Sequence, residues 1–244
     1  MKVISFKNYQ SLSDFAATEI ADAIRKKPSL FLCLASGDTP KLTVELLVKK
    51  LKEQKADHSA ITFIGLDEWA GLPPTNTGSC QYFFQNKLIG PLQLKPSQYL
   101  LFDALANDLQ SECKKMDNFI SDKHGIDIML VGIGMNGHIG FNEPGTSFNN
   151  LSHVIELDEI TKSVGQKYFI EQVELSKGIT IGFKHLLNAG KVFLMANGSR
   201  KAEVIKRTVE GPVTEDFPAS VMQEHHNGFI LIDNEAASLL NKSH

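Results

Sequence analysis

The sequence is poor in cysteine and lacks an excess of either charge. Its three cysteines, Cys33, Cys80 and Cys113, are odd in number and widely spaced, which disfavours a disulfide framework and indicates reduced thiols. Lysine and arginine number 25 against 28 acidic residues, and a net charge of −3 argues against nucleic acid or membrane as the main partner. There is no apolar run of about 18 residues and no N-terminal apolar core of signal-peptide length, so we expect a cytoplasmic protein.

The rest of the composition is that of an ordinary folded protein. Hydrophobic residues make up 42% and charged residues 22%, which excludes wholesale disorder. The 18 glycines and 9 prolines are too few for a collagen-like or linker-like chain. No internal repeat and no flexible linker divides the sequence. Since a domain takes roughly 100–200 residues, we predict a single domain that spans residues 1–244.

Short apolar runs rich in β-branched residues alternate with longer amphipathic stretches, a pattern typical of βαβ units. Strands are predicted at 30–35, 61–66, 126–132, 191–196 and 229–232, and helices at 11–26, 40–52, 104–122 and 200–209. Thr39 is the expected N-cap of the second helix, with Pro40 as its first residue. We therefore predict an α/β fold, with a mostly parallel, Rossmann-like open sheet and helices on both of its faces.

Polar segments follow three of these strands, at 36–39, 67–69 and 132–143, and the first and third contain glycine. Loops at the carboxyl ends of parallel strands meet at one edge of an open sheet, where ligands bind, so we expect one shared site. The first segment, Ser36-Gly37-Asp38-Thr39, leads into a helix whose free N–H groups and dipole suit a phosphate, although an ordinary capped turn is an equal alternative. It lacks the P-loop lysine and the dinucleotide glycine triplet, which disfavours ATP or NAD.

The other two segments carry candidate acid–base groups. One of the two carboxylates at 67–68 could be a base desolvated by neighbours such as Trp69, although solvated turn residues are the commoner case. A glycine-rich loop holds Asn136, His138 and Glu143, and a loop histidine five residues before a carboxylate favours acid–base chemistry over a core histidine. A metal site is disfavoured, because no second histidine or cysteine lies nearby.

Together these segments make the sequence resemble the sugar-phosphate isomerase/deaminase family that includes glucosamine-6-phosphate deaminase. The resemblance covers about residues 30–232 and is most specific in Gly-His-Ile-Gly-Phe-Asn-Glu-Pro-Gly at 137–145. The segments Leu66-Asp67-Glu68-Trp69 and Gly78-Ser79-Cys80 are more similar to the galactosamine-6-phosphate branch of that family.

The resemblance implies a role for each matching residue. Asp67 would abstract the proton from C2 of the sugar, and His138 would catalyse ring opening. Asn136 and Glu143 would support His138; the family commonly has aspartate where this chain has Asn136, and an amide can orient an imidazole but supplies no charge.

The resemblance also implies a phosphate-binding end and a small lid segment. The loop from Ser36 to Thr39, together with Lys201, would hold the phosphate. Lys167, on the lid, stands where glucosamine enzymes often have a phosphate-binding arginine. From the residues alone, a solvated surface position is the commoner case for both lysines. Asp38 replaces the usual glycine or alanine, so we expect its carboxylate to turn outward from a phosphate.

The expected reaction is deamination and aldose–ketose isomerisation of an amino-sugar phosphate, with galactosamine 6-phosphate giving tagatose 6-phosphate and ammonia. Glucosamine 6-phosphate, giving fructose 6-phosphate, is the alternative, followed by a 6-phosphogluconolactonase-like hydrolase or a non-catalytic sugar-phosphate sensor. The two amino sugars differ only at C4, which we expect the 69–80 segment to read. No redox step occurs, so no cofactor and no metal is expected, while a homo-oligomer is possible.

Overall fold

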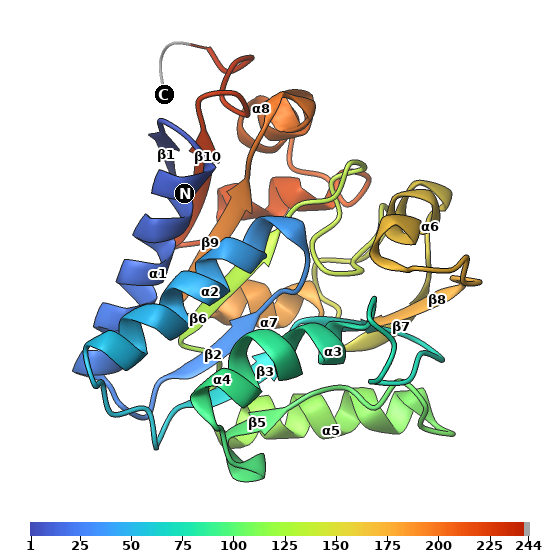
Figure 1. Ribbon diagram of the computed structural model, residues 1–244. Helices are drawn as coiled ribbons and strands as arrows, with labels where there is room; N and C mark the ends of the chain where they lie inside the picture. Colours follow the sequence, from blue (N-terminus) through green and yellow to red (C-terminus); the bar gives the residue numbers. More distant parts are fainter. Residues whose placement is uncertain (242–244) are drawn as a thin grey trace.

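A seven-stranded parallel sheet forms the centre of the computed structural model, which describes residues 1–241 (Figure 1). The strand order is β1-β10-β9-β6-β2-β3-β5, and every neighbouring pair is parallel. The strands are β1 (Lys2–Phe6), β2 (Phe31–Leu34), β3 (Thr62–Gly65), β5 (Tyr99–Leu100), β6 (Ile128–Gly132), β9 (Lys191–Ala196) and β10 (Gly228–Asp233). The prediction of a mostly parallel α/β sheet is confirmed.

Helices cover both faces of this sheet, as predicted. They are α1 (Tyr9–Lys26), α2 (Asp38–Glu53), α3 (Cys80–Phe84), α4 (Gly90–Leu92), α5 (Leu109–Asp122), α6 (Glu159–Gly165), α7 (Phe183–Asn188) and α8 (Ala202–Glu210). Alternate side chains of each strand enter two separate apolar clusters: on β2, Cys33 packs with residues of α5 and α7, whereas Leu32 packs with residues of α1 and α2. This two-sided burial is why the strands read as continuous apolar runs.

A smaller antiparallel sheet lies beyond the carboxyl edge of the main one. It consists of β4 (Asp67–Trp69), β8 (Lys177–Thr180) and β7 (His153–Glu156), in the order β4-β8-β7. We call residues 153–180, which include α6, the small lobe (Figure 1, right). The prediction that residues 67–69 form a loop is therefore wrong: they pair with β8, and Asp67 stands opposite Thr180.

The predicted start of the second helix is also wrong. Helix α2 begins at Asp38, and its N-cap is Gly37, which has a φ of +106° that favours glycine. Thr39 instead directs its hydroxyl to the Asn197 side chain, at 3.2 Å. Within residues 1–241, no helix is long and apolar enough to cross a membrane.

Candidate functional site

A cavity of about 390 Å³ opens at the carboxyl edge of the main sheet, between that edge and the small lobe. Most of the residues predicted for the site line it: Ser36, Gly37, Asp38, Thr39, Asp67, His138, Lys167 and Lys201. Asn136 and Glu143 do not line the cavity but contact His138 or its partner. The segments that follow β2, β3 and β6 thus meet in one place, as the topology of a parallel sheet requires.

One end of the cavity is the N-terminus of α2. Its N-cap Gly37 makes no side-chain hydrogen bond to the helix, so the first-turn N–H groups and the positive end of the helix dipole are available to an anion. The Tyr9 hydroxyl fixes this turn, because it lies 2.8 Å from the Thr39 carbonyl and accepts the Leu42 N–H at 3.2 Å. A Cβ at Gly37 would come within 3.3 Å of the Tyr168 hydroxyl on the small lobe.

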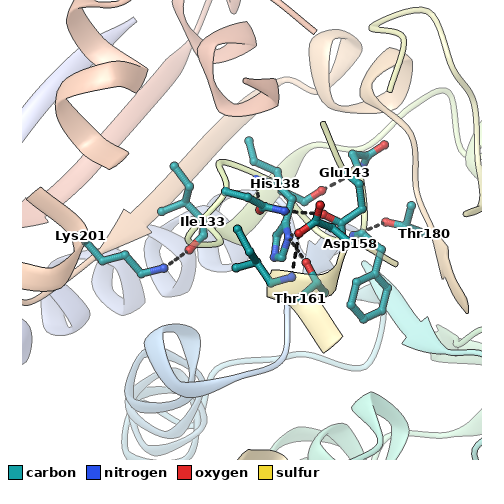
Figure 2. Close-up of polar contacts among 12 residues, drawn as sticks. Ile133, His138, Glu143, Asp158, Thr161, Thr180 and Lys201 are labelled. Carbon is teal, nitrogen blue, oxygen red and sulfur yellow. Dashed lines mark hydrogen bonds and ion pairs between the residues drawn. The ribbon is translucent and has the colours of Figure 1, made fainter. Parts of the chain in front are cut away.

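Two lysines converge on the same end. Lys201 closes the turn Ser199–Lys201 before α8, and its ammonium donates to the Ile133 carbonyl at 2.5 Å (Figure 2). Burial, and then the charges of Lys167 and Arg200, lower the pKa of Lys201 to about 8. A bound anion would favour the protonated lysine.

Lys167, on the small lobe, pairs with Asp38 instead of standing free. The Lys167 Nζ lies 2.6 Å from Asp38 Oδ2, and both side chains keep much of their exposure to solvent. The Asp38 carboxylate therefore turns to the lobe, where it neutralises a cation that faces the cavity.

The first residue of β4, Asp67, presents its carboxylate to the cavity. Burial, and then the adjacent charge of Glu68, raise the pKa of Asp67 from an ordinary 3.8 to about 7, while a hydrogen bond from Cys80 acts in the opposite direction. Asp67 Oδ1 lies 3.5 Å from the Cys80 Sγ. An ionised Asp67 is consequently a stronger base than a solvated aspartate.

The neighbouring carboxylate, Glu68, is turned the other way and is fully buried. It accepts the N–H groups of Cys80 at 2.9 Å and Gln81 at 2.7 Å, and the Ser79 hydroxyl at 2.9 Å. Glu68 therefore caps the N-terminus of α3. Of the acidic pair, only Asp67 faces the cavity.

His138 lines the cavity and belongs to a hydrogen-bonded group with Glu143, Thr161 and Asn136 (Figure 2). Its Nδ1 lies 3.2 Å from Glu143 Oε2 and 3.0 Å from the Thr161 hydroxyl, and the Asn136 amide donates to Glu143 Oε2 at 2.8 Å. Burial alone would raise the pKa of Glu143, but the hydrogen bonds from His138, Thr161 and Asn136 outweigh it and lower that pKa. The Glu143 carboxylate can thus hold a proton on Nδ1, which leaves Nε2 to exchange protons with a ligand.

Gly134 must be a glycine because the His138 ring lies directly against its backbone. A Cβ at Gly134 would collide with His138 Nε2 and its neighbouring ring carbons. The glycine-rich composition of this loop therefore has a concrete cause, the close approach of the histidine ring to the backbone.

Sequence reasoning missed three residues of this site: Tyr9, Thr161 and Cys80. Tyr9 and Thr161 belong to helices that no motif connects with the cavity; only the folded chain brings Thr161 to the cavity and Tyr9 to the start of α2. Cys80 has no sequence signal beyond its place in a segment that resembles one branch of the family. No cluster of three or more potential metal ligands occurs in the part of the chain that the structure describes.

Comparison with known proteins gives a consistent result. The family described as glucosamine-6-phosphate isomerases/6-phosphogluconolactonase matches residues 7–231. Glucosamine-6-phosphate deaminase 1 of Bacillus subtilis (strain 168) is 38% identical over 241 residues, 98% of this chain and 99% of the relative. Glucosamine-6-phosphate deaminase of Bacillus pumilus is 40% identical over 241 residues, 98% of this chain and 100% of the relative.

Solved structures agree with this assignment. One described as a monomeric glucosamine-6-phosphate deaminase has a TM-score of 0.95 at 37% identity and covers 98% of this chain and 100% of its own. A 6-phosphogluconolactonase from Trypanosoma brucei has a TM-score of 0.77 at 19% identity and covers 98% of both chains, a likeness of fold alone.

The chain belongs to the glucosamine-6-phosphate isomerase/6-phosphogluconolactonase family. Within that family it is an amino-sugar-phosphate isomerase/deaminase.

Proposed function

We propose that the chain converts glucosamine 6-phosphate and water to fructose 6-phosphate and ammonia. The observation that carries the proposal is that Asp67 and His138 line the same cavity as the α2 N-terminus and two lysines. The curated relatives named above support glucosamine over galactosamine as the amino sugar. The assignment of roles to residues below is part of the proposal.

The phosphate binds at the start of α2. Backbone N–H groups of the loop from Ser36 to Thr39 form the cradle, together with the Thr39 hydroxyl, and Lys201 supplies a charge-assisted contact. Lys167 exchanges its ion pair with Asp38 for the phosphate, so that the small lobe contacts the substrate. Holding the sugar by its phosphate orients C1 and C2 toward the two acid–base groups.

Ring opening falls to His138. The proton of the anomeric hydroxyl must leave while the ring oxygen gains one, and a neutral imidazole can perform both transfers through Nε2. Glu143, held by the Asn136 amide, fixes the ring and stabilises the imidazolium that forms between the two transfers.

Proton abstraction from C2 falls to Asp67. The open-chain aldehyde acidifies the C2 proton, and its removal gives an enolamine. Protonation at C1 then produces a ketose imine; water adds to the imine carbon, and the C–N bond breaks to release ammonia. With a pKa of about 7, Asp67 is largely ionised just above neutrality and is still basic enough for this step.

The deciding experiment incubates the purified protein with glucosamine 6-phosphate and, separately, with galactosamine 6-phosphate, and measures ammonia and ketose. We expect a higher kcat/KM for the gluco substrate. Galactosamine 6-phosphate remains the second candidate because Trp69, which packs against Phe141 and Phe169, belongs to the cavity wall and to the segment that resembles the galactosamine branch. Preference for that substrate, with tagatose 6-phosphate as product, would replace the gluco assignment.

Two further outcomes separate the remaining alternatives. Hydrolysis of 6-phosphogluconolactone without ammonia release from either amino sugar would indicate a lactonase. Binding of the sugar phosphates without any product would indicate a sensor. A possible homo-oligomer stays a prediction, which sedimentation of the purified protein would test.

A further inference from the structure

The Cys80 thiol connects two parts of the cavity that the proposed function uses separately. Cys80 is the first residue of α3, is almost fully buried, and lines the cavity. Its Sγ accepts the Ser36 hydroxyl at 3.0 Å and lies 3.5 Å from Asp67 Oδ1. Among residues 1–241, no other side chain is hydrogen-bonded to the Asp67 carboxylate.

This thiol can act as a donor because it stays protonated. Burial, and then the charges of Glu68 and Asp67, raise the pKa of Cys80 well above its usual range. Burial and the charge of Asp67 do the same to the pKa of Cys33 on β2. The titratable groups that face Asp67 from β2, β4 and α3 are thus two neutral thiols and Glu68, and only Cys80 offers the carboxylate a proton.

The direction of the S–H group follows from its second contact. The Cys80 sulfur accepts a hydrogen bond from the Ser36 hydroxyl, so the S–H proton is available to donate to Asp67. Ser36 directly precedes the α2 N-cap, so the hydrogen-bonded chain runs from the phosphate cradle through the sulfur to the base.

We propose that Cys80 is a positioning residue for the Asp67 base: its S–H group favours the ionised carboxylate and holds it in one orientation, and Ser36 orients that S–H group from the phosphate-binding loop. The inference rests on the proposed function, in which Asp67 removes the C2 proton. Its consequence is that losing the thiol makes Asp67 harder to ionise.

The test uses three variants of the whole chain. Cys80→Val removes the donor at similar volume, and Cys80→Ser retains a donor. Cys113→Val is the matched control, because Cys113 is equally buried on α5 but does not line the cavity. The readout is the ratio of variant to wild-type kcat/KM across pH 5.5–9. Lys201 titrates in both proteins, so its effect cancels in this ratio.

For Cys80→Val we expect the midpoint of the acid limb of the kcat/KM profile to rise by about one pH unit. A shift of one pKa unit corresponds to about 1.36 kcal/mol, which is about the free energy of a hydrogen bond to a charged group. Activity then falls about tenfold at pH 6 and much less at pH 9, where Asp67 is ionised in both proteins. Cys80→Ser restores most of the wild-type profile, and Cys113→Val follows the wild type. A Cys80→Val profile parallel to the wild type, or a serine variant that behaves like valine, would overturn the inference.

A second readout does not depend on turnover. In protein labelled with ¹³C at aspartate carboxyls, the Asp67 signal is identified by its loss in Asp67→Asn and is titrated in the wild type and in Cys80→Val. The midpoint should rise in the valine variant, and an unchanged midpoint would overturn the inference. If the wild type releases no ammonia from either amino sugar, the proposed function fails, while this titration still decides whether Cys80 controls the ionisation of Asp67.

Discussion

Replacing Asp67 by asparagine is expected to remove activity and to stabilise the fold in the same variant. The carboxylate ionises at a cost, because burial and Glu68 raise its pKa from 3.8 to about 7. Between these two pH values, the folded protein holds a proton that the unfolded chain has already lost. The stability of the wild type therefore falls as the pH rises through this window. The asparagine variant does not lose this stability, because its side chain does not ionise.

The size of the effect follows from the two pKa values. Linkage gives a destabilisation of about 1.7 kcal/mol at pH 5 and about 4.3 kcal/mol at pH 8 from this one carboxyl. Because Asp67 borders a water-accessible cavity, solvent screening reduces these upper limits to about half. The difference in free energy of unfolding between variant and wild type should thus grow by about 1.3 kcal/mol from pH 5 to pH 8, where 1 kcal/mol corresponds to about 2–4 °C in Tm.

The assay pairs thermal unfolding at pH 5, 6, 7 and 8 with ammonia release from glucosamine 6-phosphate at pH 8. Asp122→Asn, an exposed change at the end of α5, is the matched control and should show no pH-dependent gap. Turnover should fall by at least the roughly 10²–10⁴-fold typical of a lost general base. Wild-type turnover in Asp67→Asn would remove this residue from the mechanism, and a Tm gap that is constant with pH would refute the reasoning from burial.

Three further changes address the other end of the cavity and the second acid–base group. His138→Gln should lower kcat by about 10²–10⁴-fold while fructose 6-phosphate still binds by calorimetry; an unchanged kcat would contradict its role. Asp38→Ala frees Lys167 and should lower KM up to about fivefold at low salt, the size of a surface ion pair; an unchanged KM would mean that this pair does not compete with phosphate. Lys201→Met should raise KM at least about tenfold with little change in kcat, and wild-type KM should rise above about pH 8 as Lys201 loses its proton; a pH-independent KM from pH 7 to 9 would exclude Lys201 as a phosphate ligand.

Local sequence determined the parallel sheet and the place of the site. A strand buried on both faces needs a continuous apolar run, and the runs at 61–66 and 191–196 correspond to β3 and β9. The apolar run at 126–132 corresponds to β6, and its end determines where the polar loop that carries His138 begins. The loop histidine and its carboxylate partner are only five residues apart, within reach of a local motif.

What only the tertiary structure decided involves contacts between distant segments. Asp67 and Glu68 are equivalent in the sequence, and the choice between them is made by the N-terminus of α3, whose N–H groups bind Glu68 and leave Asp67 to the cavity. Strand β4 exists because residues 177–180 return to pair with it, and neither segment has enough apolar pattern to be recognised alone. The small lobe brings Thr161 to His138 in the same way. Sequence periodicity indicates which face of a helix or strand is buried. Which distant residues meet at the cavity depends instead on how the whole chain packs.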